Sequence, residues 1–291
     1  MAVKTWSTPA GEEKKRPVPC ALCGGGEFKR YLYCEGFAYV RCKRCGLAQI
    51  NPQPEQAEVA RRYREGSGAE YLSYELANEA AFLRLQELAL QDAGFEELEA
   101  AIKRSNAARP RVLDAGCATG ALLEKLRDRG WDCAGVELSP AAEYARAERG
   151  LDVRRASLEE SRFPGASFDL VLASHLIEHL NDPAAFVREA YRVLAPGGRF
   201  LVTTPNIAGF QARLFRSRWR SAIFDHLYLF SAKTLSALLR QSGFGIERIC
   251  TWGGLAAGTA PAPVKRLADR AAKRLGAGDV MVIRARKEGA D

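Results

Sequence analysis

One glycine-bracketed turn, within residues 111–120, constrains the fold of this chain more than any other feature. A short apolar run ends in Asp114, a turn bracketed by Gly116 and Gly120 follows, and residues 121–129 then have helical spacing. Because glycine lacks a Cβ atom, a ligand can lie directly against the main chain of such a turn. Strand, glycine turn and helix in this order predict an open parallel sheet with its ligand at the carboxyl ends of the strands.

The spacing of the glycines and a later acid indicate what kind of ligand this is. The turn reads Gly-Cys-Ala-Thr-Gly, so alanine replaces the middle glycine of the dinucleotide fingerprint and the last glycine comes one place early. About twenty residues further on, a second predicted strand ends in Glu137, where a carboxylate can bind ribose hydroxyls. The pattern therefore favours a nucleoside ligand over a dinucleotide.

Four motifs in this order resemble those of the class I S-adenosylmethionine-dependent methyltransferases. They are VLDAGCATG at 112–120, GVELS at 135–139, SFDLVLASHLIEHLNDP at 167–183 and VLAPGGRFLVTTPN at 193–206. The resemblance implies an α/β fold with a Rossmann-like seven-stranded sheet, helices on both faces and an antiparallel last strand. It also implies S-adenosylmethionine as methyl donor and S-adenosylhomocysteine as product.

The same resemblance implies which residues hold the cofactor, including adenine contacts just after the third strand. The predicted cofactor-binding residues are Asp114, Ala115, Gly116, Cys117, Gly120, Glu137, Leu138, Ser157, Leu158 and Ser174.

Two matched cysteine pairs near the start of the chain predict a structural zinc site. Cys20 and Cys23 form one pair and Cys42 and Cys45 the other, each as Cys-x-x-Cys-Gly, which is the spacing of a zinc ribbon. Residues 27–33 and 37–41 alternate as the strands of a hairpin would. Zinc would supply the folding energy of so small a module. Accidental pairs or a redox disulfide are the alternatives.

The sequence predicts three parts, which are a zinc-ribbon module at 17–50, a helical cap or linker at 51–108 and an S-adenosylmethionine-binding methyltransferase domain at 109–291. The stretch 55–103, interrupted at Gly66-Ser-Gly68, predicts one short and one long helix. Its tyrosines, Tyr63, Tyr71 and Tyr74, are candidates for a lid over the cofactor or substrate, with surface packing as the alternative.

The chain has three histidines, and two of them follow the fourth predicted strand, 167–173. A histidine suits proton removal from a hydroxyl acceptor, so His175 or His226 is the expected base, while Glu178 would orient it or bind a metal. His179 is a further catalytic candidate or a structural residue. This stretch also resembles the ubiquinone-pathway O-methyltransferases, some of which bind a divalent cation through Glu-x-x-Glu-His, but here His175 replaces the first acid.

The later part of the chain bears on the acceptor. Ser174-His-Leu-Ile follows strand four where many amino-group methyltransferases have Asp/Asn-Pro-Pro-Tyr, which favours oxygen or an activated carbon as the acceptor atom. A loop insertion at 209–230 is expected to cover the acceptor pocket, and 244–249 is expected to pair with 279–285 as a closing antiparallel hairpin. We expect a small-molecule acceptor such as a sugar, quinone, phenol or natural-product intermediate.

The net charge of +8 allows a second interpretation. The basic excess is spread over 14–16, 213–220 and 265–274 and forms no single dense block, which is typical of a basic enzyme surface but would also suit nucleic acid. A zinc-ribbon RNA methyltransferase is therefore the alternative function. No apolar run approaches the roughly 18 residues of a membrane span, and residues 1–15 lack the apolar core of a signal peptide, so we expect a cytoplasmic protein. The pattern gives no signal for oligomeric state.

Overall fold

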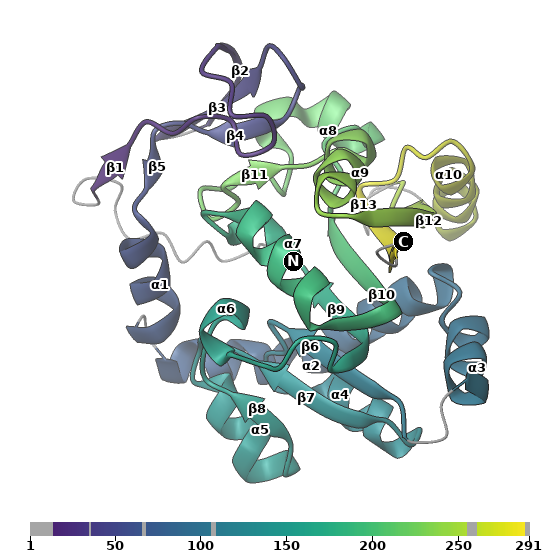
Figure 1. Ribbon diagram of the computed structural model, residues 1–291. Helices are drawn as coiled ribbons and strands as arrows, with labels where there is room; N and C mark the ends of the chain where they lie inside the picture. The colour runs from purple at the N-terminus through teal and green to yellow at the C-terminus, as the bar shows by residue number, and fades with distance from the viewer. Residues whose placement is uncertain (1–13, 35, 66–67, 106–108, 255–260, 289–291) are drawn as a thin grey trace.

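The computed structural model describes residues 14–34, 36–65, 68–105, 109–254 and 261–288. A seven-stranded sheet forms the centre of the molecule (Figure 1). In spatial order its strands are β8 (Asp152–Arg154), β7 (Asp132–Val136), β6 (Arg111–Ala115), β9 (Phe168–Ser174), β10 (Leu194–Pro205), β13 (Val280–Lys287) and β12 (Phe244–Trp252).

The direction of the strands confirms the predicted sheet. β8, β7, β6, β9 and β10 pair in parallel, whereas β13 runs antiparallel to both β10 and β12. The closing hairpin pairs Ile246 with Ala285 and Ile249 with Ile283, as the sequence predicted. All carboxyl ends of the parallel strands therefore meet at one edge, which is where open α/β sheets bind their ligands.

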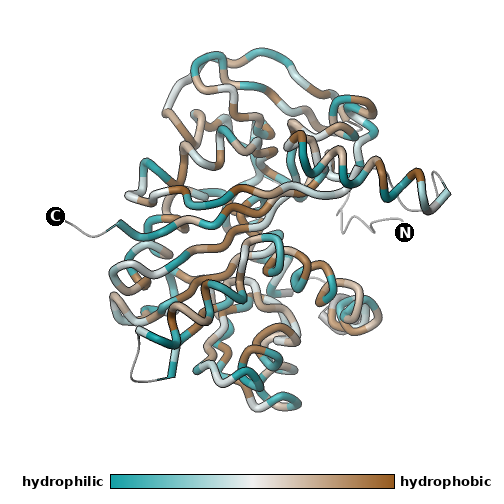
Figure 2. The backbone as a smooth tube through the Cα atoms, turned by 90° about the vertical axis from the view of Figure 1, so that its right-hand side faces the viewer, coloured by the Kyte–Doolittle hydropathy of each residue, from teal (hydrophilic) through white to brown (hydrophobic). Residues whose placement is uncertain are grey.

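Helices cover both faces of this sheet and bury two apolar clusters against it. α7 (Pro183–Val193) and α9 (Ala232–Gln241) pack on one face, and α3 (Phe95–Ser105), α4 (Ala121–Asp128) and α5 (Ala141–Arg149) pack on the other. Figure 2 shows hydrophobic residues concentrated along the central strands between these layers. Side chains cap both helices of the first face, since Asp182 accepts from Ala185 N at the start of α7 and Ser231 accepts from Thr234 N at the start of α9.

The helical segment before the sheet contains more helices than the sequence predicted. α1 (Gln56–Glu65), α2 (Gly68–Asp92) and α3 replace the expected one short and one long helix, and Gly66 and Ser67 lie outside the described residues. The prediction missed the break at Gly94, which has a left-handed φ of 74°. A residue with a side chain would be strained at this φ, so the turn favours glycine and ends the helix.

A second, four-stranded sheet joins the start of the chain to the predicted insertion. Its order is β11 (Tyr228–Leu229), β4 (Ala48–Ile50), β3 (Phe37–Cys42) and β2 (Phe28–Cys34). The β2–β3 hairpin confirms the predicted strands of the ribbon. β11 was not predicted, because 209–230 was expected to be a loop. The same insertion also contains α8 (Phe210–Phe215) and the 3-10 turn η2 (Arg216–Arg218).

The remaining elements are short or peripheral. They are the pair β1 (Lys15–Arg16) and β5 (Gln53–Pro54), α6 (Leu158–Ser161), the 3-10 turn η1 (Ile177–His179) and α10 (Ala262–Arg274). Within the described ranges, no helix combines the length and the apolar character needed to cross a membrane. The predicted domain boundaries at 50/51 and 108/109 stay predictions.

Candidate active site and metal centre

A cavity of about 1330 Å³ lies at the carboxyl ends of β6, β7 and β9. It brings together most of the residues that the sequence predicted for cofactor and acceptor. These are Ala115, Gly116, Cys117, Glu137, Leu138, Ser157, Leu158, Ser174, His175, His179 and His226. Of the other candidates, Asp114 lines a small neighbouring recess, and Glu178 is fully buried beside His175.

The glycine turn after β6 has the geometry of a ligand cradle. Gly116 has a φ of 76°, and its N–H and that of Cys117 both donate to Val136 O, at 2.9 and 3.2 Å. Gly120 is required for packing and not for a ligand contact. A Cβ there would lie 2.5 Å from Leu151 Cδ1, so this glycine lets α4 pack closely against the sequence after α5.

Glu137 ties the second strand to this turn. Its carboxylate accepts hydrogen bonds from Ala118 N at 3.1 Å and Ser139 N at 2.7 Å, and the residue is nearly buried at the cavity wall. Each carboxylate oxygen has a second lone pair, so ribose hydroxyls could still donate to it. The site therefore fits the predicted ribose contact.

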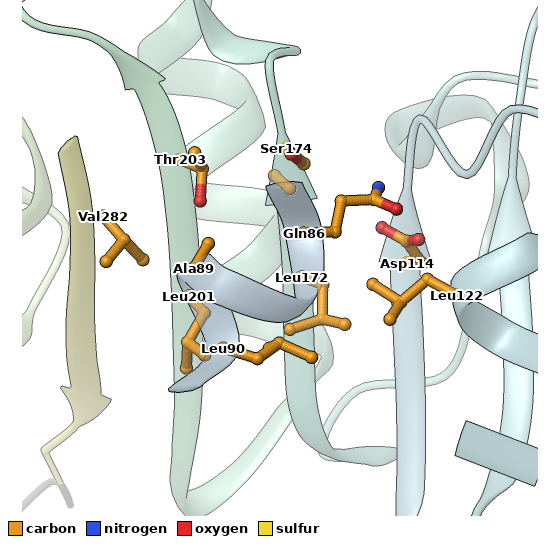
Figure 3. Close-up of a pocket in the computed structure, with 11 residues that line it drawn as sticks. Gln86, Ala89, Leu90, Asp114, Leu122, Leu172, Ser174, Leu201, Thr203 and Val282 are labelled. Carbon is orange, nitrogen blue, oxygen red and sulfur yellow. The ribbon is translucent and has the colours of Figure 1, made fainter. Parts of the chain in front are cut away.

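Asp114 is the most unusual polar group of the site. It is 1% exposed, and neither carboxyl oxygen has a hydrogen-bond partner among the described residues. Burial, with a smaller contribution from the charge of Glu137, raises the pKa of Asp114 to about 8. The carboxyl borders a recess of about 20 Å³ that Ser174 and Thr203 also line. Figure 3 shows the Gln86 side chain of α2 directed toward it. An unpaired buried carboxyl fits a site completed by a polar ligand or a bound water.

A helix of the cap closes over the glycine turn. Glu79 of α2 accepts a hydrogen bond from Thr119 Oγ1 at 2.5 Å and pairs with Arg149 of α5 at 2.7 and 2.8 Å. Glu79, Gln86 and Tyr74 of this helix all line a cavity of the site. The cap therefore forms one wall of the cofactor side, although the sequence had indicated only its tyrosines. The Tyr71 side chain lies outside the described part of the structure.

The end of β9 presents a histidine–carboxylate pair. His175 has a left-handed φ of 53°, a costly conformation for a residue with a side chain, and its Nδ1 lies 3.2 Å from Glu178 Oε1. Thr204 Oγ1 donates to the other oxygen of Glu178 at 2.9 Å. The hydrogen bond to His175 and the three nearby histidines outweigh burial and lower the pKa of Glu178 to about 2.

His179 and His226 form a second cluster in the same cavity. Their rings meet edge to face with centroids 4.7 Å apart, and Tyr63 Oη lies 3.0 Å from His179 Nδ1. His226 Nδ1 lies 2.8 Å from Ser221 O, so Nδ1 must carry the proton and leave Nε2 as an acceptor. Burial, with His179 next, lowers the pKa of His226 to about 3. Glu178, His179 and His226 each bring a ligand atom within 4.8 Å of the others, a spacing that also suits a cation.

The four predicted zinc ligands converge on one point. Cys20, Cys23, Cys42 and Cys45 each offer a sulfur atom within 4.8 Å of the others. Cys20 Sγ lies 3.3 Å from Cys45 Sγ, and Cys23 Sγ lies 3.5 Å from Cys42 Sγ. A tetrahedral zinc ion with bonds of about 2.3 Å holds its sulfur ligands about 3.8 Å apart. The residues therefore fit a closed zinc site.

The two cysteine turns have matching backbones. Gly24 and Gly46 both have left-handed φ values, 68° and 84°, and each N–H bonds to the carbonyl of the first cysteine of its pair. Burial opposes ionisation of Cys42, but backbone N–H groups and the neighbouring thiols lower its pKa to about 7. Burial raises the pKa of the Cys20 and Cys45 thiols, so of these three cysteines only Cys42 ionises more readily than a free thiol.

Comparison with known proteins identifies the family. A family model described as a methyltransferase domain matches residues 82–249, more than half of the chain. The chain belongs to the class I S-adenosylmethionine-dependent methyltransferases. The sheet order and the glycine turn after β6 agree with this family, which supports S-adenosylmethionine as methyl donor.

Two curated relatives of this methyltransferase match part of its length. A probable S-adenosylmethionine-dependent methyltransferase from Mycolicibacterium smegmatis is 37% identical over 144 residues, which is 47% of this chain and 52% of the relative. A ubiquinone biosynthesis O-methyltransferase from Caulobacter sp. strain K31 is 39% identical over 104 residues, which is 33% of this chain and 41% of the relative. The matches thus span about half the length of these relatives.

Solved structures show the same fold. A methyltransferase from Thermotoga maritima is 24% identical, with a TM-score of 0.51 over 75% of this chain and 99% of that one. The [4+2]-cyclase SpnF is 21% identical, with a TM-score of 0.55 over 82% of this chain and 99% of that one. Because a cyclase shares the fold, the fold alone does not assign the reaction, and the residues of the site must carry that argument.

Proposed function

We propose that this methyltransferase transfers a methyl group from S-adenosylmethionine to a hydroxyl, or an activated carbon, of a small molecule. The observation that carries the proposal is the pair formed by His175 and the buried Glu178, which opens into the cavity that the glycine turn also lines. This is the arrangement of a general base and the carboxylate that orients it. The relative named as a ubiquinone biosynthesis O-methyltransferase supports oxygen as the acceptor atom.

Different residues of the site would bind the donor, remove the proton and orient the acceptor. Gly116, Glu137 and the unpaired Asp114 would bind the donor, and bound S-adenosylmethionine would supply the methyl group from its sulfonium. His175 would take the acceptor's hydroxyl proton as the new C–O bond forms and the C–S bond breaks, while Glu178 stabilises the resulting imidazolium. His226, held neutral with Nε2 free of a proton, would accept a hydrogen bond from the acceptor and orient it.

The two histidines owe these roles to opposite surroundings. His175 has a carboxylate partner and a side chain that is 43% exposed, so it can contact both Glu178 and an acceptor in the cavity. His226 is almost fully buried and its burial disfavours the charged form. This difference in environment supports proton transfer by His175 and positioning of the acceptor by His226.

We further propose that Cys20, Cys23, Cys42 and Cys45 bind one structural zinc ion. Four sulfur ligands complete a tetrahedral shell and leave no position for water, so the ion would hold the ribbon together and take no part in the transfer.

A transfer assay tests the proposed activity. The full chain is incubated with S-adenosylmethionine labelled in its methyl group and with a panel of phenols, quinols and sugars. We expect label in a hydroxyl-bearing acceptor, and we expect His175→Ala to lower this transfer by about 10²–10⁴-fold. The same change should leave the affinity for S-adenosylhomocysteine intact, because His175 lies on the acceptor side.

RNA serves as the contrasting substrate. Label that enters only RNA, together with RNA binding that weakens steeply with salt, would replace the small-molecule proposal by a nucleic-acid one. A matched control is Asp128→Asn, an exposed change at the end of α4, which should transfer label as the wild type does.

A further inference from the structure

We propose that Tyr39 of the zinc ribbon is a positioning residue that holds His226 in place for the acceptor. The inference rests on the proposed function, because it concerns the acceptor side of the same site. The loop that carries His226 lies against the ribbon, where β11 adds to the edge of β4 (Figure 1).

Tyr39 makes the decisive contact. It lies on β3 with no exposed surface, and its hydroxyl is 2.8 Å from both Ile223 O and His226 O. The phenol is the hydrogen-bond donor to these two carbonyls. Because the carbonyl of His226 belongs to the same residue as the imidazole, fixing it limits where the ring can point. Removing the hydroxyl would take this donor from the His226 carbonyl, whereas Ile223 O would keep the N–H of His226 at 3.1 Å, so the peptide after His226 would have to move to regain a partner.

Neighbouring contacts hold both sides of the loop against the ribbon. Ile50 N donates to Leu227 O at 2.9 Å. The rings of Phe37 and Phe224 meet with centroids 5.6 Å apart. The peptide next to His226 is therefore part of the ribbon sheet, and its position depends on the register of β3 and β4.

The cysteines set that register. β3 ends at Cys42, three residues after Tyr39, and β4 begins at Ala48, shortly after Cys45. A zinc ion bound to both cysteines would fix these strand ends relative to each other. The donor side is held differently, since Gly116 and its neighbour bond to Val136 O of β7. Loss of zinc should therefore disturb His226 and spare the donor pocket.

Because the chain contains only three histidines, NMR spectroscopy can follow the imidazole of His226 individually. Protein labelled with ¹³C-histidine should give three imidazole signals, and the one missing from His226→Asn identifies His226. In Tyr39→Phe we expect the His226 signal to move, S-adenosylhomocysteine affinity to stay within about twofold, and kcat for an accepted substrate to fall about tenfold or more. The control is Tyr33→Phe, the same change in the same ribbon at a side chain that is 79% exposed.

Zinc removal from the wild type gives a second measurement in case Tyr39→Phe does not fold. Chelation should move the His226 signal, and added Zn²⁺ should restore it in the wild type but not in Cys42→Ser, which separates the ribbon from direct binding at Glu178, His179 and His226. An unmoved His226 signal in either experiment, or a Tyr33→Phe effect equal to that of Tyr39→Phe, overturns the positioning role. If the wild type transfers no methyl group to any acceptor while the His226 signal still follows zinc, the proposed function fails and the link between ribbon and histidine stands.

Discussion

Replacing Asp114 by asparagine should stabilise this protein, and increasingly so as the pH rises. Burial raises the pKa of Asp114 from its ordinary 3.8 to about 8. Between about pH 4 and pH 8, the folded state therefore keeps a proton that the unfolded state has already released. The protonated carboxyl contributes its full stability below about pH 4, where the unfolded state is protonated as well. This contribution is lost as the pH rises toward about 8, the pKa of Asp114 in the folded state. Asparagine has the same shape and no proton to lose.

The size of the effect follows from the shift. Each pKa unit corresponds to about 1.4 kcal/mol, so a difference of about four units gives an upper bound of about 6 kcal/mol above pH 8. We expect roughly half of this, because buried sites relax and admit water. Urea unfolding at about pH 5, 7 and 9 should show the advantage of Asp114→Asn growing with pH. The control is Asp128→Asn, an exposed change. An advantage that is the same at all three pH values, or none at all, would refute the reasoning.

Two other predictions concern the metal and the base. Elemental analysis should find about one zinc per chain, reduced in Cys42→Ser; zinc-free protein from a preparation without chelator would contradict the ribbon site. His175→Ala should lose about 10²–10⁴-fold in methyl transfer with unchanged S-adenosylhomocysteine affinity, and full activity of both this variant and His226→Asn would remove histidine from the mechanism.

The glycine turn and the proposed donor contacts have a local sequence signal. The glycine turn and Glu137 lie within one strand–turn–helix–strand unit, and each residue type is required by backbone geometry or hydrogen bonding close to it in sequence. The cysteine pairs are similarly local, since each turn contains both of its ligands and its glycine. Such short patterns need no knowledge of how distant segments meet.

The acceptor side could not be predicted in the same way. Tyr39 and His226 lie 187 positions apart, and a lone tyrosine in a strand carries no periodic signal of its partner. The two-residue strand β11 is too short to show alternation, so the insertion was expected to be a loop. Glu79 and Gln86 were similarly hidden within the Ala- and Leu-rich helix α2, where nothing in the neighbouring sequence marks them as cavity residues. Only the assembled fold brings these groups to the cavity.

The central claim is that the turn after β6 and Glu137 form the binding site for the methyl donor. Calorimetric titration of the full chain with S-adenosylhomocysteine tests it most directly, in the wild type and in Glu137→Ala. We predict one site per chain and a loss of about 1.5–3 kcal/mol in the variant, the usual cost of a lost charged hydrogen bond. No binding to the wild type, or equal affinity in Glu137→Ala, would contradict the account.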